Sequence, residues 1–398
     1  MFSYDSSIRA RAIAETLVHA KAMAVKLGIT RVTDTTRLDR AGVPVFASIR
    51  PTAAVGSLSV NAGKGLTEAE ARIGAYMESI EIACAEPVRS PHPIVHATGR
   101  EIAATGYPLL DFMPRNDVTL DETIAIPCIE AEDLVNHRRC LVPADRVLFP
   151  FPSSYFTSDT NGLASGNTVL EATVHGLCEV VERDILSFGN VRRWHHLRLE
   201  TLPSRLAEIA ERMASVDLRL FVRVLENDYD LPFFNAMVQE PNVVDALHMG
   251  YGCHLWSQIA ATRAVTECFQ ERLTIIHGGR DSLQRLREQG IREPERVGMK
   301  DAYIDRLAQE PCTLSFADVV DWRPETPDLE SIYAALERRV VPIAGGILRV
   351  VFTPADSPIQ VVKVIVPRME FYMSERMHKG PRLRAAQAGV IARSNASV

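Results

Sequence analysis

The chain has 398 residues, a formal net charge of -6 at pH 7, 46% hydrophobic residues and 24% charged residues. This composition excludes a disordered or low-complexity protein, because the chain has ample apolar surface to bury. The slightly acidic balance argues against a general nucleic-acid binder, which is usually basic, and we expect no nucleic acid among the partners.

Seven cysteines are spread along the chain, and none of them forms a Cys-x-x-Cys pair. This spacing indicates neither a zinc ribbon nor a disulfide framework, so we expect reduced thiols and a cytoplasmic protein. Residues 1–11 are polar and mixed, and no apolar stretch reaches the roughly 18 residues of a membrane helix. We therefore expect no membrane segment.

Hydrophobic periodicity and turn residues predict helices and strands along most of the chain. A helix over 8–27 ends at Gly28, and five prolines mark 87–125 as rich in loops. The other predicted helices cover 204–214 and 327–339. The predicted strands cover 43–49, 56–60, 146–150, 218–225, 346–353 and 360–366.

These strands and helices do not alternate regularly, which favours an α+β or mixed α/β fold with an antiparallel-rich sheet. No linker rich in Pro, Ser or Gly divides the chain. We expect an N-terminal helical segment over 1–40 and one large domain over 41–398.

An internal repeat is the most informative feature of the sequence. Residues 65–81 read GLTEAEARIGAYMESIE and residues 166–182 read GNTVLEATVHGLCEVVE. Both copies carry Gly, Thr, Glu-Ala and a final Glu-x-x-Glu at the same positions. A third segment, 254–272, keeps Ala260, Ala264, Glu267 and Gln270 in the same frame.

Each copy opens as a helix start. Thr67 with Glu70, and Thr168 with Glu171, fit the capping box, in which a hydroxyl and a carboxylate satisfy free backbone amides. The glycines that precede these helices also suit a bound phosphate, because a helix N-terminus presents N–H groups and the positive end of its dipole. Lys64 lies in such a stretch, Gly63-Lys64-Gly65.

The paired acids point to a cation. Glu78 and Glu81 share one helix face, and on the second helix Glu171, His175, Glu179 and Glu182 fall within a sector of roughly 80°. Two carboxylates ~5 Å apart repel by about 3 kcal/mol at an effective dielectric near 20. Either the acids form a solvated face with Arg72 and Arg183 as partners, or the two faces converge on Mg²⁺, which binds carboxylates together with substrate phosphates.

A di-iron site is disfavoured, since neither copy has the Glu-x-x-His spacing that such a site expects. On the third helix Arg263, Glu267 and Gln270 share a face, whereas Arg272 points to the other side. An arginine beside a metal and phosphate neutralises the transferring oxygens. The alternative for Arg263 is an ion pair with Glu267 one turn away.

Near the C-terminus, Gly380-Pro381-Arg382 follows a basic stretch. We expect Arg382 to reach back into an anionic site, the alternative being a solvated tail.

Over about residues 40–385 these motifs resemble the YcaO family of ATP-dependent peptide-modifying enzymes. The resemblance rests on the combination of motifs. These are Ile49-Arg50-Pro51, Gly63-Lys64-Gly65-Leu66-Thr67, Met77-Glu78-Ser79-Ile80-Glu81, Asn161-Gly162-Leu163-Ala164, Gly166-Asn167-Thr168, Glu171-Ala172, His175-Gly176-Leu177-Cys178-Glu179, Val181-Glu182-Arg183-Asp184, Arg263-Ala264-Val265-Thr266-Glu267, Val362-Lys363-Val364-Ile365-Val366-Pro367 and Gly380-Pro381-Arg382.

The resemblance implies a YcaO-like fold over 41–398, with acidic helices lining a site for ATP and Mg²⁺. It implies phosphorylation of a backbone amide oxygen in a ribosomally made precursor peptide, addition of a nucleophile, and loss of phosphate. The resulting site assignment places metal on Glu78, Glu81, Glu179 and Glu182, nucleotide on Lys64, Asn167, Glu171, Arg183, Gln270 and Arg272, and catalysis on Arg263 and Arg382. An arginine of the third helix is expected to contact phosphate. Arg263 is favoured over Arg272 because it lies on the same helix face as Glu267 and Gln270.

Three departures from the family pattern bear on the subfamily. Thr160 stands where many members carry Ser, Ile82 follows Glu81 where Arg is frequent, and no proline follows Pro381. Without a Pro-rich tail, the chain resembles stand-alone members that work with a TfuA-like partner and form backbone thioamides. Azoline formation with a ubiquitin-activating-like partner is the other product class, and the resemblance implies a homodimer.

Two other hypotheses remain. One is an ATP-dependent ligase or kinase for a small molecule, and the other is a peptide-binding scaffold without catalysis.

Overall fold

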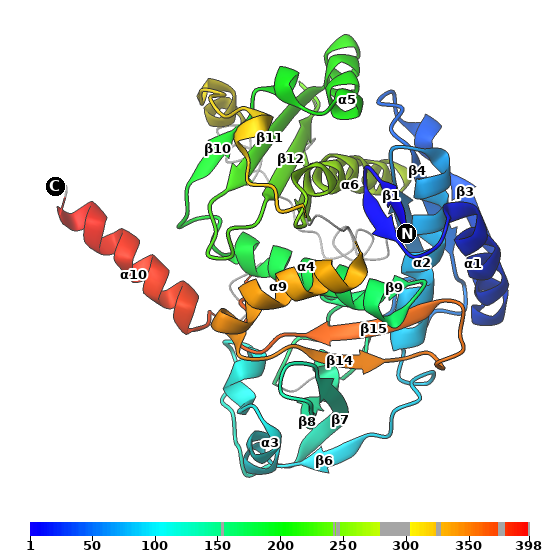
Figure 1. Ribbon diagram of the computed structural model, residues 1–398, viewed down its shortest axis with the longest axis vertical. Coiled ribbons are helices and arrows are strands. Elements are labelled where there is room, and N and C mark those ends of the chain that lie inside the picture. The colour runs from blue at the N-terminus through cyan, green and yellow to red at the C-terminus, as the bar shows by residue number, and fades with distance from the viewer. Residues whose placement is uncertain are drawn as a thin grey trace.

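The computed structural model describes residues 1–152, 155–241, 243, 247–278, 303–323, 328–372 and 379–396 (Figure 1). Every pairing between its named strands is antiparallel, which confirms the expected mixed α/β fold with antiparallel sheets. The strands are β1 Phe2–Tyr4, β2 Ser7–Arg9, β3 Arg31–Asp34, β4 Val45–Ile49, β5 Val60–Lys64, β6 Val95–Ala97, β7 Ile126–Asp133, β8 Arg138–Pro143, β9 Leu163–Gly166, β10 Trp194–His196, β11 Arg219–Leu225, β12 Phe233–Gln239, β13 Leu247–Cys253, β14 Leu348–Val351 and β15 Gln360–Ile365.

These strands form a hairpin and three sheets. β1 and β2 make the hairpin, β3-β4-β5 a three-stranded sheet, and β10-β11-β12-β13 a four-stranded sheet. The six-stranded sheet has the order β6-β7-β14-β15-β9, with β8 also paired to β7. Because β3 pairs with β4, the three-stranded sheet joins residues on both sides of residue 40.

The α-helices are α1 Ile13–Leu27, α2 Glu68–Ala85, α3 Gly99–Thr105, α4 Val169–Ser187, α5 Ser204–Ser215, α6 Ser257–His277, α9 Leu329–Ala344 and α10 Pro381–Ala396. In Figure 1, α4 and α9 lie together over one face of β14 and β15, and α10 projects away from the body. Short 3-10 turns occur at Thr36–Leu38, Leu109–Phe112, Ala144–Arg146, Leu199–Thr201 and Phe316–Asp318.

The repeated sequence segments are repeated strand–turn–helix units. β5 leads into α2, β9 into α4 and β13 into α6, and each helix packs on its own strand. The glycines allow this close approach: a Cβ on Gly63 would lie 2.0 Å from the backbone nitrogen of Ala75, and one on Gly252 would lie 2.0 Å from the carbonyl oxygen of Ala260. The third repeat, weak in sequence, is therefore structurally equivalent to the other two.

The predicted capping boxes form only in part. The Thr67 and Thr168 hydroxyls each accept a hydrogen bond from the backbone N–H three residues later, at Glu70 and Glu171. The returning carboxylate bond to the cap residue does not form, because Glu70 accepts from the N–H of Leu66 and Glu171 binds other partners. These two carboxylates therefore make contacts other than the expected capping bond.

Several predicted elements require correction. The first helix begins at Ile13 because residues 7–9 form β2, and the strand expected at 56–60 is a turn that precedes β5. No strand covers 146–150. Val147 and Leu148 in that run are fully buried in the core beside the Ala144–Arg146 turn, and burial outside a strand leaves the same apolar pattern.

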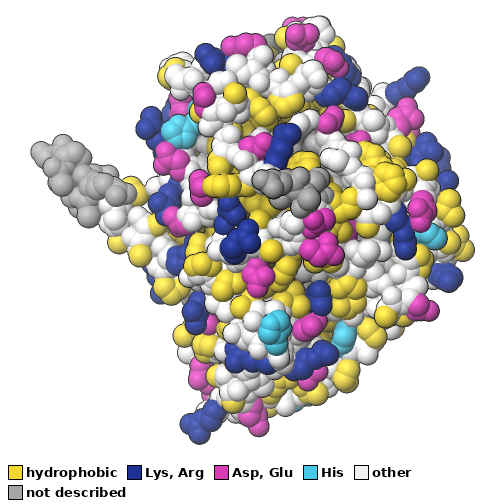
Figure 2. Space-filling view, viewed as in Figure 1, with side chains coloured by type: hydrophobic (Ala, Val, Ile, Leu, Met, Phe, Trp, Pro, Cys, Tyr) yellow, Lys and Arg dark blue, Asp and Glu magenta, His cyan; other side chains and the backbone are white. Residues whose placement is uncertain are grey.

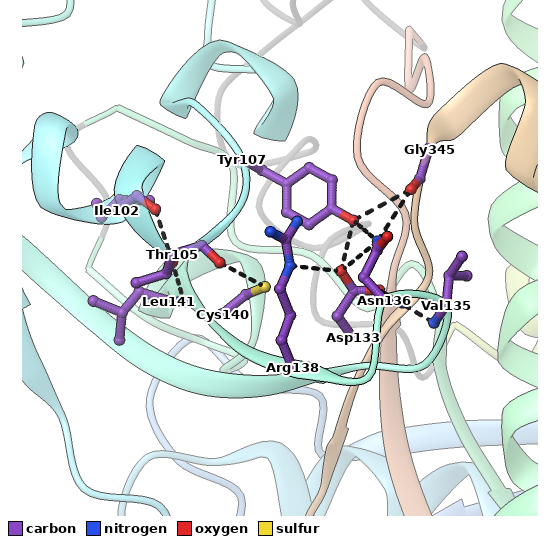
Figure 3. Close-up of polar contacts among 10 residues, drawn as sticks. All are labelled: Ile102, Thr105, Tyr107, Asp133, Val135, Asn136, Arg138, Cys140, Leu141 and Gly345. Atoms are coloured by element: carbon purple, nitrogen blue, oxygen red, sulfur yellow. Dashed lines mark hydrogen bonds and ion pairs between the residues drawn. The ribbon is translucent and has the colours of Figure 1, made fainter.

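A polar network fixes the β7–β8 hairpin to the turn between α9 and β14 (Figure 3). The Tyr107 hydroxyl and the Asn136 amide each donate to the buried carboxylate of Asp133 at 2.8 Å, and Arg138 donates to it at 3.3 Å. The Asn136 amide also donates to the carbonyl of Gly345 at 3.4 Å. The network lies apart from the cavity described below and has a structural role.

The seven cysteines all lie in the described part of the chain and are free thiols, of which only Cys312 is exposed. Among the helices that the structure describes, none combines the length and the apolar character needed to cross a bilayer. On the face shown in Figure 2, acidic and basic side chains are interspersed with apolar ones.

Candidate nucleotide and metal site

A cavity of about 860 Å³ lies where the three repeated helices meet. Its walls come from α2, α4, α6, β5, the N-terminal hairpin and the start of α1. Ten of the twelve residues assigned from the sequence line it, namely Lys64, Glu78, Glu81, Asn167, Glu171, Glu179, Glu182, Arg183, Arg263 and Gln270. The two acidic faces therefore converge on one cavity.

Arg72, the other partner considered for a solvated acidic face, lies 4.9 Å above the ring of Phe46 and does not line the cavity.

Glu81 is the most strongly perturbed acid. Its pKa is raised to about 8, mainly by burial and also by the nearby carboxylates of Glu78 and Glu179, against the lowering effect of Ser165. Ser165 donates two hydrogen bonds to Glu81 Oε1, one from its N–H at 2.8 Å and one from its hydroxyl at 2.5 Å. The carboxylate is thus held in a fixed orientation against β9.

Glu179 and Glu182 on α4 behave in the same way. The pKa of each is raised to about 7, mainly by burial and also by neighbouring acids, although Arg183 opposes the rise. Glu182 accepts a hydrogen bond from the N–H of Cys253 at 3.1 Å, and Arg183 lies 3.9 Å from Glu182. A buried cluster whose acids repel one another suits a divalent cation, which would remove the repulsion.

Lys64, at the end of β5, forms an ion pair with Glu267 of α6. Burial alone would raise the pKa of Glu267, but Lys64 and Arg183 lower it below its ordinary value. Gln270, one turn further, donates to the carbonyl of Ala62 and to Glu78 at 3.2 Å. Glu267 therefore takes part in the site as the partner of Lys64 and does not pair with Arg263.

The N-terminal end of α4 is closed by residues from the start of the chain. Asn167 donates to both carboxylate oxygens of Glu171 at 3.1 Å and accepts from the Thr16 hydroxyl at 2.8 Å. Arg9 forms an ion pair with Glu171 at 3.1 Å, and the N–H of Ala10 donates to it at 2.9 Å. Asn167 and Glu171 thus form one buried polar unit at the cavity edge.

Arg263 projects from α6 into the cavity and donates to the carbonyl of Ser6 at 3.3 Å. It forms no ion pair with any residue that the structure describes. Burial lowers the pKa of this guanidinium below its ordinary value, with a further contribution from Arg9. A buried cation without an acid partner suits an anion such as a phosphate.

Arg272 and Arg382, which the sequence assigned to nucleotide binding and catalysis, do not line the cavity. Arg272 lies on the opposite side of α6 and pairs with Asp39 at 2.8 Å and with Glu240 at 2.8 Å. Arg382, at the start of α10, pairs with the buried Asp184 at 2.7 Å. Both guanidiniums are bound by internal carboxylates.

Sequence reasoning missed Arg9, Thr16 and Ser165 as site residues. Arg9 and Glu171 are 162 positions apart, and Ser165 and Glu81 are 84 apart. Helical and strand periodicity reports only on neighbours in the chain, so no pattern in this sequence could have paired them.

The donor set fits Mg²⁺ and a nucleotide. The cavity is lined by carboxylates, and Lys64, Arg9, Arg183 and Arg263 supply positive charge to it. Among the described residues, no three His, Cys, Asp or Glu side chains already form a set that could hold a metal ion alone. Mg²⁺ takes one or two carboxylates and completes its shell with substrate phosphates and water.

A mixed α/β fold that gathers acids and cations around one cavity defines a protein that binds a nucleotide with a divalent cation. The model of the family described as YcaO cyclodehydratase, ATP- and Mg²⁺-binding, matches residues 62–370. The chain belongs to the YcaO family, and its cofactors are ATP and Mg²⁺.

Two relatives and one solved structure are similar over most of the chain. An uncharacterized protein of Methanothermobacter thermautotrophicus is 32% identical, covering 90% of this chain and 94% of its own. A protein of Rhizobium leguminosarum bv. trifolii, described as uncharacterized and in the tfuA 3′ region, is 30% identical, covering 87% and 85%. YcaO from Methanopyrus kandleri, bound with AMPPCP and Mg²⁺, is 25% identical with a TM-score of 0.74, covering 96% and 98%.

Proposed function

We propose that this protein uses ATP and Mg²⁺ to activate a backbone amide in a ribosomally made precursor peptide. The observation that carries the proposal is the convergence of the two Glu-x-x-Glu faces on one cavity, which the cations of Lys64 and Arg263 also line. The family to which the chain belongs is described as cyclodehydratases, which supports an amide as the group attacked.

The chemistry answers a specific difficulty. An amide oxygen is a poor leaving group, and bound Mg-ATP supplies the phosphoryl group that makes it a good one. A sulfur, oxygen or nitrogen nucleophile adds to the amide carbon, the oxygen leaves as phosphate, and loss of a proton restores a C=S or C=N double bond. Phosphoryl transfer of this kind relies on positioning and charge neutralisation.

In this proposal each wall of the cavity has its own role. Glu78, Glu81, Glu179 and Glu182 hold the Mg²⁺ ions, while Asn167 and Glu171 bind the nucleoside end. Lys64, Arg183, Arg263 and Gln270 face the phosphates. Lys64 must give up part of its contact with Glu267 to bind phosphate, and its flexible stem allows this.

For the product we propose a backbone thioamide, formed with a TfuA-like partner protein and an external sulfur donor. The relative in the tfuA 3′ region supports this choice. Azoline formation with a ubiquitin-activating-like partner is the competing outcome.

The test is reconstitution with candidate precursor peptides, Mg-ATP, a sulfide source and a TfuA-like protein. We expect a product in which sulfur replaces one backbone oxygen, together with ADP and phosphate. Loss of one water from the peptide would instead identify an azoline. ATP consumption that needs a small-molecule acceptor and leaves every peptide unchanged would overturn the proposal.

Glu182→Gln tests the acidic cluster, and Glu130→Gln is its matched control. Glu182→Gln preserves shape but removes one carboxylate of the cluster, so we expect loss of ATP turnover in the reconstituted reaction. Glu130→Gln makes the same chemical change at an exposed carboxylate on β7, far outside the cavity lining. It should leave turnover at the wild-type level.

A further inference from the structure

We propose that His175 binds the polyphosphate part of the nucleotide through a hydrogen bond from its imidazole ring. This inference rests on the proposed function, because it takes Mg-ATP as the ligand of the cavity. It adds a residue for which the site assignment had no role.

His175 lies midway along the functional face of α4. It is one helical turn after Glu171, in the proposed nucleoside end, and one turn before Glu179, in the proposed metal cluster. Its side chain lines the cavity between these two groups. Mg²⁺ bound by Glu179 and Glu182 would share its shell with phosphate oxygens, so a ligand that spans both ends must pass His175 with its phosphates.

The ring has hydrogen-bonding capacity that the protein leaves unused. Nδ1 of His175 is buried and has no hydrogen-bond partner among the described residues. A buried polar atom without a partner costs about 1–3 kcal/mol, and such atoms are rare in folded proteins. A bound ligand that accepts a hydrogen bond from the ring would remove this cost.

The positive charges around His175 favour an anionic ligand. Arg263, Arg9 and Lys64 all line the same cavity and act on the ring, and the buried ring of His254 lies near it. Burial and these cations together lower the pKa of His175 well below its ordinary value, so the ring is neutral. A neutral imidazole can donate one hydrogen bond to a phosphate oxygen without adding a fourth charge to the cationic cluster.

Paired nucleotide titrations by calorimetry, with Mg²⁺ present, test this contact. His175→Phe keeps a ring of similar size but cannot donate a hydrogen bond, whereas His175→Gln keeps a donor. A hydrogen bond to a charged group is worth about 1.5–3 kcal/mol, so we expect His175→Phe to bind ATP about 10- to 150-fold more weakly. Affinity for AMP, which lacks the β- and γ-phosphates, should stay within about twofold, and His175→Gln should retain most of the ATP affinity.

Thermal unfolding without nucleotide provides a second readout. Because His175 carries an unsatisfied polar atom, we expect His175→Phe and His175→Ala to unfold at the wild-type temperature or above it. A purely structural histidine would give a lower temperature in both variants. That result would overturn the inference, as would unchanged ATP affinity in His175→Phe or an equal loss for ATP and AMP.

The outcome for the wild-type protein separates the two proposals. Wild-type binding of ATP with unaffected His175 variants would refute the role of His175 and leave the proposed function standing. Absence of Mg-ATP binding by the wild-type protein would refute both.

Discussion

Ser165 of β9 donates both its backbone N–H and its hydroxyl to the same oxygen of Glu81 on α2. The two residues are 84 positions apart and join the first repeated unit to the second. Because Glu81 lies in the acidic cluster, the bond sets the direction in which one proposed metal ligand points. A residue that orients a ligand in this way commonly affects metal affinity as strongly as some ligands do.

Ser165→Ala should therefore weaken the Mg²⁺ dependence of nucleotide binding. Loss of an orienting partner costs about 10- to 100-fold in metal affinity, so the Mg²⁺ concentration for half-maximal ATP binding should rise at least about tenfold. Ser165→Thr keeps the hydroxyl and should recover most of the affinity. Ser79→Ala is the matched control, because Ser79 is buried on α2 and its hydroxyl has no partner within the described chain.

Substitutions of the two arginines of α6 should affect different properties: ATP affinity for Arg263 and folding stability for Arg272. Arg263→Met removes a cation that faces the cavity, so we expect ATP affinity to fall by about tenfold or more, as for other hydrogen bonds to charged groups. Arg272→Met removes the buried partner of Asp39 and one of the two arginines that pair with Glu240, so we expect the free energy of unfolding to fall by about 3–5 kcal/mol. Nucleotide titration and urea unfolding of both variants measure the two effects. Equal loss of ATP affinity in the two variants would contradict the assignment.

The sequence was sufficient to predict the parts of the site that depend on local periodicity. Glu78 and Glu81, like Glu179 and Glu182, share a helix face because of their spacing, and the Thr67 and Thr168 caps follow from their place before an apolar pattern. Helix facing also separated Arg263 from Arg272. These features depend on the geometry of one helix.

The remaining features depend on tertiary contacts. The N-terminal hairpin reaches Glu171 through Arg9, and Arg382 turns to Asp184 on the far end of α4. Val147 and Leu148 are buried in the core, so their apolar sequence looks like that of a strand although no strand forms there. Such outcomes are decided by which surfaces meet in the folded chain, and one sequence does not encode that in its spacing.

The buried ion pair of Arg50 with Glu86 predicts a pH-dependent stability. Arg50 donates to both carboxylate oxygens of Glu86 at 2.5 and 3.1 Å, and the N–H of Ala54 also donates to it. Burial alone would raise the pKa of Glu86, but these donors lower it below its ordinary value of 4.5. Stability from this carboxylate is therefore present above that value and is lost as the pH falls through the lowered, folded-state pKa.

Glu86→Gln leaves a fully buried guanidinium without its counter-charge. We expect a loss of about 3–5 kcal/mol in the free energy of unfolding at pH 7. Below about pH 4.5 the wild-type protein should lose stability towards that of the variant, so the difference should narrow. Urea unfolding of both proteins between pH 7 and the acid limit of folding measures this, and a constant difference across the range would refute the explanation.

A side chain at position Gly346 would collide with Tyr107, which belongs to the polar network shown in Figure 3. A Cβ at this position would lie 1.8 Å from the hydroxyl oxygen of Tyr107, which is itself hydrogen-bonded to the buried Asp133. Gly346→Ala must displace that ring, so we expect a loss of about 1–3 kcal/mol, the usual cost of overpacking.

Gly389→Ala is the matched control, because a Cβ there meets nothing within 4 Å and α10 gains a better helix former. It should be neutral or stabilising by up to about 1 kcal/mol. Replacing Tyr107 by Phe in the Gly346→Ala background removes the clashing hydroxyl and should recover part of the lost stability. Thermal unfolding of the single and double variants measures the coupling, and strictly additive effects would show that the two groups do not collide.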